Sequence, residues 1–250
     1  MSHWGTSETT AAAGTRVHAA VAGPEAAPLL VCVHGLGCSH RYFAPLAEAL
    51  WHDARVVAPD LPGFGRTPGP ARALDVRGLS LALAGWLRAT GRGGAVLLGN
   101  SCGAQVVVDL AVHSPDLLGP VVLAGPTFDP AARTAPRHLL RLLRDQRWER
   151  RGLRTLLARD YLTCGPRRYV ETLRLLLADP VEDKLEHVRT PALVVRGGHD
   201  AIVPRRWTEE VAARLPVAGL AEVPGTGHTV NWSAPAELAR LVRPLLHGPA

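Results

Sequence analysis

The stretch that decides the fold is AVLLGNSCGAQVVVDLAVH, residues 95–113, in which an apolar run is followed by G-x-S-x-G at 99–103 and then by a helix-like segment. This order predicts a buried strand, a tight turn and a helix, with Ser101 on the turn. Glycines flank the serine because the chain doubles back too sharply there for Cβ atoms. The helix would aim its first N–H groups at negative charge developing beside the serine. Ser101 is therefore the candidate nucleophile.

The length and composition predict one globular domain. The chain has 250 residues, of which 47% are hydrophobic, so one substantial core is expected. No apolar stretch reaches the roughly 18 to 20 residues that crossing a bilayer requires. Residues 1–22 lack a basic start followed by an apolar block. We therefore expect no membrane partner and no export.

The cysteines and histidines argue against metal chemistry. The four cysteines show no C-x-x-C spacing, and the eleven histidines are scattered without a pattern typical of a metal site. Free thiols in a reducing compartment are the simplest interpretation of the cysteines. The sequence thus predicts a cytoplasmic protein with no metal and no cofactor.

The order of elements indicates an α/β fold, a parallel sheet with helices on both faces. Short apolar runs predict strands at 29–33, 55–58, 95–98, 120–124, 192–195 and 220–223. Between them, helical periodicity predicts helices at 42–50, 75–89, 101–113, 205–214 and 236–246. A hairpin around Gly14, with 16–21 as one arm, precedes the first of these strands. Residues 127–187 interrupt the alternation, because their leucine and arginine pattern predicts two or three amphipathic helices.

A serine hydroxyl needs a base to remove its proton, and His228 is the candidate. It follows the last expected strand in a Gly-rich loop, where a side chain can reach across the carboxyl edge of the sheet. Asp200 follows the preceding strand and would orient the imidazole. A nucleophile, a base and an acid of this kind form a catalytic triad, and the chain order Ser, Asp, His is one in which such triads occur. Asp129 and Asp60 are the rival acids.

Negative charge on a tetrahedral intermediate needs N–H donors. His34-Gly35-Leu36-Gly37 follows the first central strand, and its glycines let backbone groups come close. We expect the backbone N–H groups of Leu36 and Cys102 to be the donors. The Cys102 thiol is an alternative nucleophile, but Ser101 holds the special position in the motif.

Three further side chains are expected to contact a substrate because they lie in or beside these loops. Phe128 and Trp232 could line an apolar pocket for a small-molecule substrate, and His34 belongs to the loop of the expected N–H donors. Plain core positions are the alternative for the two aromatic residues.

Together these motifs resemble the α/β-hydrolase superfamily. The resemblance rests on HGLG at 34–37, DLPGFG at 60–65, GNSCG at 99–103, GGHD at 197–200 and GH at 227–228, in the order that the superfamily shows. It implies an eight-stranded, mostly parallel sheet with a helical cap inserted after the sixth strand. The cap would be residues 127–187, and the core would be residues 1–126 and 188–250.

The resemblance implies cleavage of an ester or thioester through the triad Ser101, His228 and Asp200 and an acyl-enzyme. The elbow is also similar to that of carbon-carbon bond hydrolases, and it departs from both groups at Cys102 and Ala104. A carbon-carbon hydrolase of a carboxylated diketone is therefore an alternative. A non-hydrolytic protein that binds or cyclises a small molecule is another, because the fold alone does not choose.

Positive charge is concentrated in the 127–187 segment. The net charge is +6, whereas residues 131–177 hold twelve arginines against four acids, a local +8 that leaves −2 for the rest. A solvated helix face is the default interpretation. The alternative is that some arginines attract a carboxylated substrate or an acidic carrier protein. Nucleic acid is not expected as a partner, because no recognised binding motif accompanies the arginines.

Overall fold

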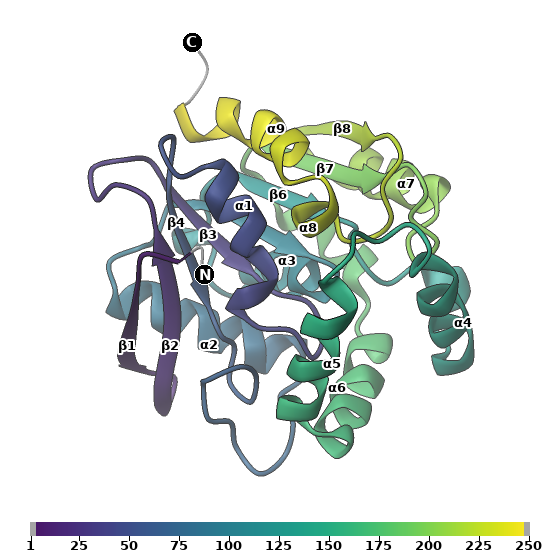
Figure 1. The fold of residues 1–250 in the computed structure, drawn as a ribbon, viewed down its shortest axis with the longest axis horizontal. Coiled ribbons are helices and arrows are strands. Elements are labelled where there is room, and N and C mark those ends of the chain that lie inside the picture. Colours follow the sequence, from purple (N-terminus) through teal and green to yellow (C-terminus); the bar gives the residue numbers. More distant parts are fainter. Residues whose placement is uncertain (1–3, 248–250) are drawn as a thin grey trace.

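An eight-stranded sheet runs through the centre of the molecule (Figure 1). The computed structural model describes residues 4–247. The strand order is β1-β2-β4-β3-β5-β6-β7-β8, and β1–β2 and β2–β4 are antiparallel while the other five pairs are parallel. The strands are β1 (Thr6–Ala12), β2 (Thr15–Ala22), β3 (Leu29–Val33), β4 (Arg55–Pro59), β5 (Val96–Asn100), β6 (Val121–Ala124), β7 (Ala192–Gly197) and β8 (Ala218–Val223). The predicted α/β class with a mostly parallel sheet is confirmed.

Helices cover both faces of the sheet. One face packs against α2 (Val76–Ala89), α3 (Cys102–His113) and α7 (Arg205–Arg214), and the other against α1 (Ala44–Ala49) and α9 (Pro235–His247). Successive side chains of a strand point to opposite faces, so Leu97 joins the core around Trp86 and Leu98 joins the core around Phe43. The apolar runs are continuous in β3, β5 and β6 because these strands are buried on both sides, whereas β8 at the edge of the sheet is mostly exposed.

The expected strands and helices begin and end within one or two residues of the observed bounds. The helix expected at 42–50 begins as a 3-10 turn, η1 (His40–Phe43), and continues as α1. Pro45 at the start of α1 has no N–H to donate, which favours a break at this point. The strand expected at 220–223 begins two residues earlier, at Ala218. The hairpin around Gly14 is confirmed by the pairing of β1 with β2.

The chain between β6 and β7, residues 125–191, is called the inserted segment below. It contains α4 (Ala135–Asp145), α5 (Leu153–Cys164) and α6 (Pro166–Ala178), besides the 3-10 turns η3 (Pro130–Ala132), η4 (Val181–Asp183) and η5 (Leu185–His187). Figure 1 shows α5 and α6 side by side at the bottom and α4 at the right, all three away from the β1–β2 hairpin. The remaining short elements are η2 (Pro115–Leu117) and α8 (Val230–Ser233). Among residues 4–247, no helix has the length and apolar composition that a membrane span needs.

Candidate active site

Ser101 occupies a strained turn between β5 and α3. Its φ is +58° and its ψ is −125°, a backbone conformation that residues other than glycine rarely adopt. The turn also brings chains too close for side chains, because a Cβ at Gly103 would lie 2.1 Å from the carbonyl oxygen of Val33, and one at Gly99 would lie 2.5 Å from that of Gly103. The Ser101 N–H donates to Ala124 O at 2.9 Å, which ties the turn to β6. Such strain persists only where the surroundings hold it, as they do here.

His228 and Asp200 meet beside this turn, from the loops after β8 and β7. The imidazole Nδ1 donates to Oδ2 of Asp200 at 2.8 Å. The other oxygen, Oδ1, accepts from the N–H groups of Ile202 and Val203, each at 2.8 Å. Because a carboxylate only accepts, the proton lies on Nδ1. Nε2 has no hydrogen-bond partner within residues 4–247, so it is free to take a proton.

The charges around His228 favour its protonated form. Burial acts to lower the pKa of His228, but the negative charges of Asp200, Asp145 and Glu149 outweigh burial and raise it to about 9. A general base must be neutral to accept a proton. The capacity of His228 to act as a base therefore increases as the pH rises towards 9.

Ser101 and His228 line one small cavity, with a volume of about 40 Å³. A volume of this size holds a few water molecules. Its other walls come from the loop after β3 and from all three helices of the inserted segment, including Tyr161 and Tyr169. The same two tyrosines line a wider apolar groove between α5 and α6, of about 520 Å³, together with Ala158, Leu162, Pro166 and Val170.

Leu36 and Cys102, the residues of the expected N–H donors, both lie beside Ser101, because Leu36 lines the same cavity and Cys102 follows the serine in the chain. Burial raises the pKa of the Cys102 thiol to about 12, although the backbone N–H groups of Leu36 and Cys102 act in the opposite direction. A Cβ at Gly35 would be 3.3 Å from Cβ of Ser101, which places the loop after β3 against the serine. A thiol with this pKa is neutral at physiological pH, which disfavours Cys102 as the nucleophile.

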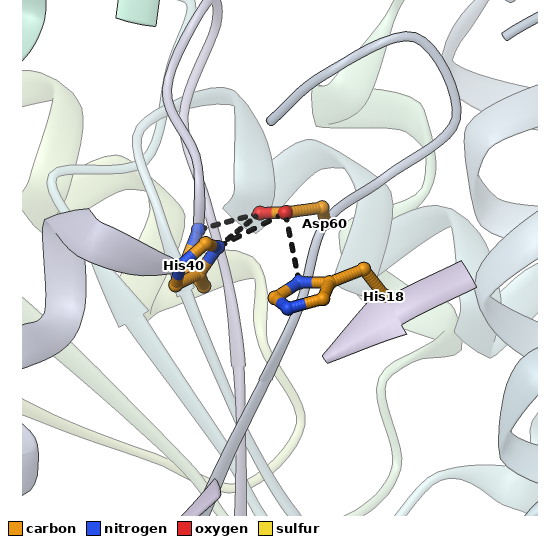
Figure 2. A group of neighbouring side chains, drawn as sticks. All are labelled: His18, His40 and Asp60. Carbon is orange, nitrogen blue, oxygen red and sulfur yellow. Dashed lines mark hydrogen bonds and ion pairs between the residues drawn. The ribbon is translucent and has the colours of Figure 1, made fainter. Parts of the chain in front are cut away.

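The two rival acids are engaged elsewhere. Asp129 accepts from Arg206 at 2.6 Å and from Arg141 at 3.3 Å. Asp60 accepts from His18 Nδ1 at 3.2 Å and from His40 Nδ1 at 3.0 Å (Figure 2). Asp200 is thus the one of the three candidate acids that is bonded to the imidazole of His228 in the described chain.

His18, His40 and Asp60 also have the spacing of a metal site, since their ligand atoms lie within 4.8 Å of one another. Hydrogen bonds account for the arrangement. Asp60 additionally accepts from the backbone N–H groups of His40 at 2.7 Å and Arg66 at 2.9 Å. The Arg66 guanidinium lies 3.5 Å from His18 Nε2, which leaves the proton on Nδ1, facing the carboxylate (Figure 2). Burial acts to raise the pKa of Asp60, but the two histidines hold it well below its ordinary value.

The three side chains expected to contact substrate do not line the cavity at Ser101. His34 is buried, its Nδ1 lies 2.8 Å from Gly35 O, and its Nε2 accepts from the N–H of Leu61 at 3.0 Å. Phe128 packs in a small apolar cluster with Cys102, and Trp232 packs against the core beneath α1 and α9. The ring nitrogens of His34 are both occupied, Trp232 packs on apolar neighbours, and the ring of Phe128 meets edge-on the imidazole of His138, with centroids 4.9 Å apart, so Phe128 lies one side chain away from the cavity.

Other side chains around Ser101, His228 and Asp200 were not expected from the sequence. The amide of Asn100 accepts from the Tyr42 hydroxyl at 2.6 Å and donates to Ala124 O at 3.0 Å and His228 O at 3.5 Å. Asp145 and Glu149 contact the backbone at His228, and the only sequence signal for them is a pair of acids, four residues apart, in an arginine-rich segment. All of these contacts join segments that are distant in the sequence.

Residues 30–241 match the model of the alpha/beta hydrolase family. The chain belongs to this family. It is 30% identical to a pimeloyl-(acyl-carrier protein) methyl ester esterase of Aromatoleum aromaticum, over 88% of this chain and 99% of the relative. It is 28% identical to a 2-hydroxy-6-oxononadienedioate/2-hydroxy-6-oxononatrienedioate hydrolase of Burkholderia vietnamiensis, over 85% of each. Among solved structures it is similar to the enol-lactonase of Burkholderia xenovorans, with a TM-score of 0.79, 23% identity and coverage of 96% of this chain and 100% of the other. The protein is an enzyme of the hydrolase type.

Proposed function

We propose that this hydrolase cleaves an ester or thioester of a small organic acyl substrate through an acyl-enzyme. Ser101 is the nucleophile, His228 the general base and acid, and Asp200 the residue that orients the imidazole. The backbone N–H groups of Leu36 and Cys102 hold the oxyanion. The observation that carries the proposal is the imidazole of His228, bonded to buried Asp200 and sharing a cavity with a serine at a left-handed φ.

The proposed reaction has two halves. Oγ of Ser101 forms a bond to the carbonyl carbon while its proton moves to Nε2 of His228. The bond to the leaving alcohol or thiol then breaks, and that group takes the proton from Nε2. A water molecule attacks the acyl-enzyme, again giving its proton to Nε2, and the acid leaves as Ser101 recovers its proton. Asp200 keeps the second imidazole proton on Nδ1 throughout.

The inserted segment supports a substrate with an apolar portion. The groove between α5 and α6 is lined by aliphatic and aromatic side chains, and two of them, Tyr161 and Tyr169, also line the cavity at Ser101. Apolar walls favour a hydrocarbon part over a charged one. We propose that residues 127–187 act as a cap on the core formed by 1–126 and 188–250.

An acidic carrier protein is the proposed partner that bears the substrate. One relative is named as acting on an ester borne by such a protein. The outer surface of α4 and the residues after it is basic and apolar, because Asp145 is buried while the exposed side chains include Leu139, Leu140, Leu143, Arg137, Arg144, Arg147, Arg151 and Arg154. Such a surface complements an acidic partner.

The state of the cysteines suggests the cellular compartment in which the protein acts. Cys32, Cys38, Cys102 and Cys164 are all buried and free. Free thiols suit a reducing compartment. We therefore propose that the protein acts in the cytoplasm.

An active-site-directed fluorophosphonate tests the proposed chemistry. It should label the wild-type protein on Ser101, and Ser101→Ala should abolish labelling because the hydroxyl is lost. Ser7→Ala, on exposed β1, is the matched control and should be labelled like the wild type. Absence of labelling in folded wild-type protein would overturn the proposal and favour a binding protein.

A carbon-carbon hydrolase is the second candidate, because one relative at 28% identity is named for that activity. It would use the same serine and would be labelled in the same way. Mass spectrometry of products from a panel of esters, thioesters and vinylogous diketones separates the two. Turnover of the diketones alone would select the second candidate.

A further inference from the structure

A second pair of carboxylates, outside the proposed triad, contacts the loop that carries the base. Asp145 is the last residue of α4, and Glu149 lies in the turn that follows. The backbone N–H of His228 donates to both oxygens of Asp145, each at 3.1 Å. Oε1 of Glu149 accepts from the N–H of Thr229 at 2.8 Å, and Oε2 accepts from the Ser233 hydroxyl at 2.6 Å. The two carboxylates therefore hold the backbone at the base and at the residue after it.

The same turn reaches the loop that carries the proposed acid. Oδ1 of Asp145 accepts from the N–H of Ala201 at 3.1 Å. The indole ring of Trp148 stacks on the imidazole of His199, with ring centroids 3.7 Å apart and planes inclined by 11°. Ala201 and His199 are the two chain neighbours of Asp200. The end of α4 thus bridges the loops after β7 and β8.

Asp145 and Glu149 can lie this close to the backbone of the loop only because Gly227 has no side chain. A Cβ atom there would lie 2.9 Å from Oε1 of Glu149 and 3.0 Å from Oδ2 of Asp145. Neither oxygen can retreat without leaving the N–H group that it accepts from. A glycine directly before the base therefore makes room for both carboxylates.

Asp145 and Glu149 act on His228 whenever they are ionised, because no basic side chain neutralises them. Although the inserted segment is rich in arginine, no ion pair joins Asp145 or Glu149 to an arginine or lysine within residues 4–247. The hydrogen bonds that they accept come from backbone N–H groups and one hydroxyl, and the two carboxyl groups also bond to each other when Glu149 is protonated. Charges that are desolvated and unpaired interact strongly with the nearest titratable group.

We propose that Asp145 and Glu149 are positioning residues of the base, which hold its backbone and act on its imidazole through their negative charge. The proposal rests on the proposed role of His228. In it, the inserted segment does more than cover the cavity, since the end of α4 helps to set both the place and the protonation of the base. Neither residue exchanges a proton with the substrate.

The titratable groups that face His228 together determine the pKa of its imidazole. They are Asp200 from the loop after β7, Asp145 and Glu149, and His138 from α4. Burial lowers the pKa of His138 to about 4, so His138 is neutral at physiological pH.

Glu149 changes its charge near neutral pH. Burial, together with Asp145, raises the pKa of Glu149 to about 7, while the bonds from Ser233 and Thr229 act against this shift. Tyr42 is a further titratable neighbour, and its pKa is raised well above its ordinary value by burial, with Glu149 adding to the shift. Above pH 7 an ionised Glu149 thus stabilises the imidazolium of His228 and delays the appearance of the neutral base.

Glu149→Gln isolates the charge, because the amide keeps an oxygen that can accept from Thr229. The rate of fluorophosphonate labelling, followed from about pH 6 to about pH 10, reports the fraction of neutral His228. We expect the midpoint of the rise to fall by about one pH unit in this variant. Glu171→Gln, on α6 of the same segment, removes the same charge as a control and should leave the midpoint unchanged.

Titration of His228 by nitrogen-15 NMR gives the same midpoint without any reaction, with the signal assigned from a His228→Gln sample. Asp145→Asn is the second variant and should also lower the midpoint. Unchanged midpoints in both variants, with native circular dichroism spectra, overturn the proposal. If the wild type is not labelled at all, the proposed function fails, and the NMR titration still decides the role of the two carboxylates.

Discussion

Asp200→Asn is the change that separates the charge of the proposed acid from its shape. An asparagine retains an oxygen that can accept from the N–H groups of Ile202 and Val203, as Oδ1 does now at 2.8 Å. No negative charge then faces Nδ1 of His228, which lies 2.8 Å from Oδ2 in the wild type. Any pH-dependent difference between the two proteins therefore reports the ion pair.

The contribution of the ion pair to the free energy of unfolding follows from the pKa of His228. Burial opposes the shift, yet Asp200 and the two neighbouring carboxylates raise the pKa from 6.5 to about 9. At about 1.36 kcal/mol per unit, the folded state gains about 3 kcal/mol when the imidazole is charged. Because the folded-state value is the higher one, this stabilisation is fully present below pH 6.5 and is lost as the pH rises through about 9. Asp200 is the largest of the causes that raise the pKa, so most of the gain should disappear in the variant.

Urea unfolding at about pH 6 and at about pH 10 measures this difference. We expect the free energy of unfolding of the wild type to fall by up to about 3 kcal/mol more than that of Asp200→Asn between these two values. Asp129→Asn is a matched control, because Asp129 is equally buried but binds Arg206 and Arg141, and it should retain the wild-type dependence. The same pH dependence in the wild type and Asp200→Asn would refute the reasoning.

Two further outcomes are expected. Ser101→Gly should melt at a higher temperature than Ser101→Ala, because glycine adopts a φ of +58° freely and relief of such strain is worth about 1 kcal/mol or more; equal melting temperatures would contradict a strained turn. Arg144→Glu combined with Arg147→Glu should slow hydrolysis of a carrier-borne ester more than that of the free ester, most of all at low salt. Arg205→Glu, at an exposed position of α7, is the control for a reversed charge elsewhere on the surface, and equal losses on both esters would rule out docking by the α4 surface.

The sheet and the elbow could be predicted because each carries a local signal. Apolar runs bounded by Gly and Pro mark buried strands, and the glycines at 99 and 103 mark a turn where a Cβ has no room. His228 and Asp200 were predictable as a pair, because residues that follow adjacent parallel strands meet at one edge of the sheet. The hydrogen bond that the structure shows between them agrees with this expectation, although their catalytic role stays a proposal.

The contacts of the inserted segment could not be predicted in the same way. Asp145 lies 83 residues from His228, and helical periodicity gives the face of α4 without saying what that face meets. The sequence shows Asp145 only as an acidic residue among arginines and gives no sign of its contact with His228. His34 shows the opposite error, since its place in the loop after β3 suggested substrate contact. Its ring nitrogens instead satisfy backbone groups, which a buried polar side chain needs in any fold.

The small volume beside Ser101 has a kinetic consequence. About 40 Å³ admits a few waters and is far too little for an acyl chain, so the side chains around the cavity must move before a substrate can reach Ser101. Tyr161 and Tyr169 line both this cavity and the outer groove, so we expect their movement to limit the rate at which a substrate enters. Variation of α5 and α6 would therefore alter which molecules are accepted while the chemistry at the serine stays the same.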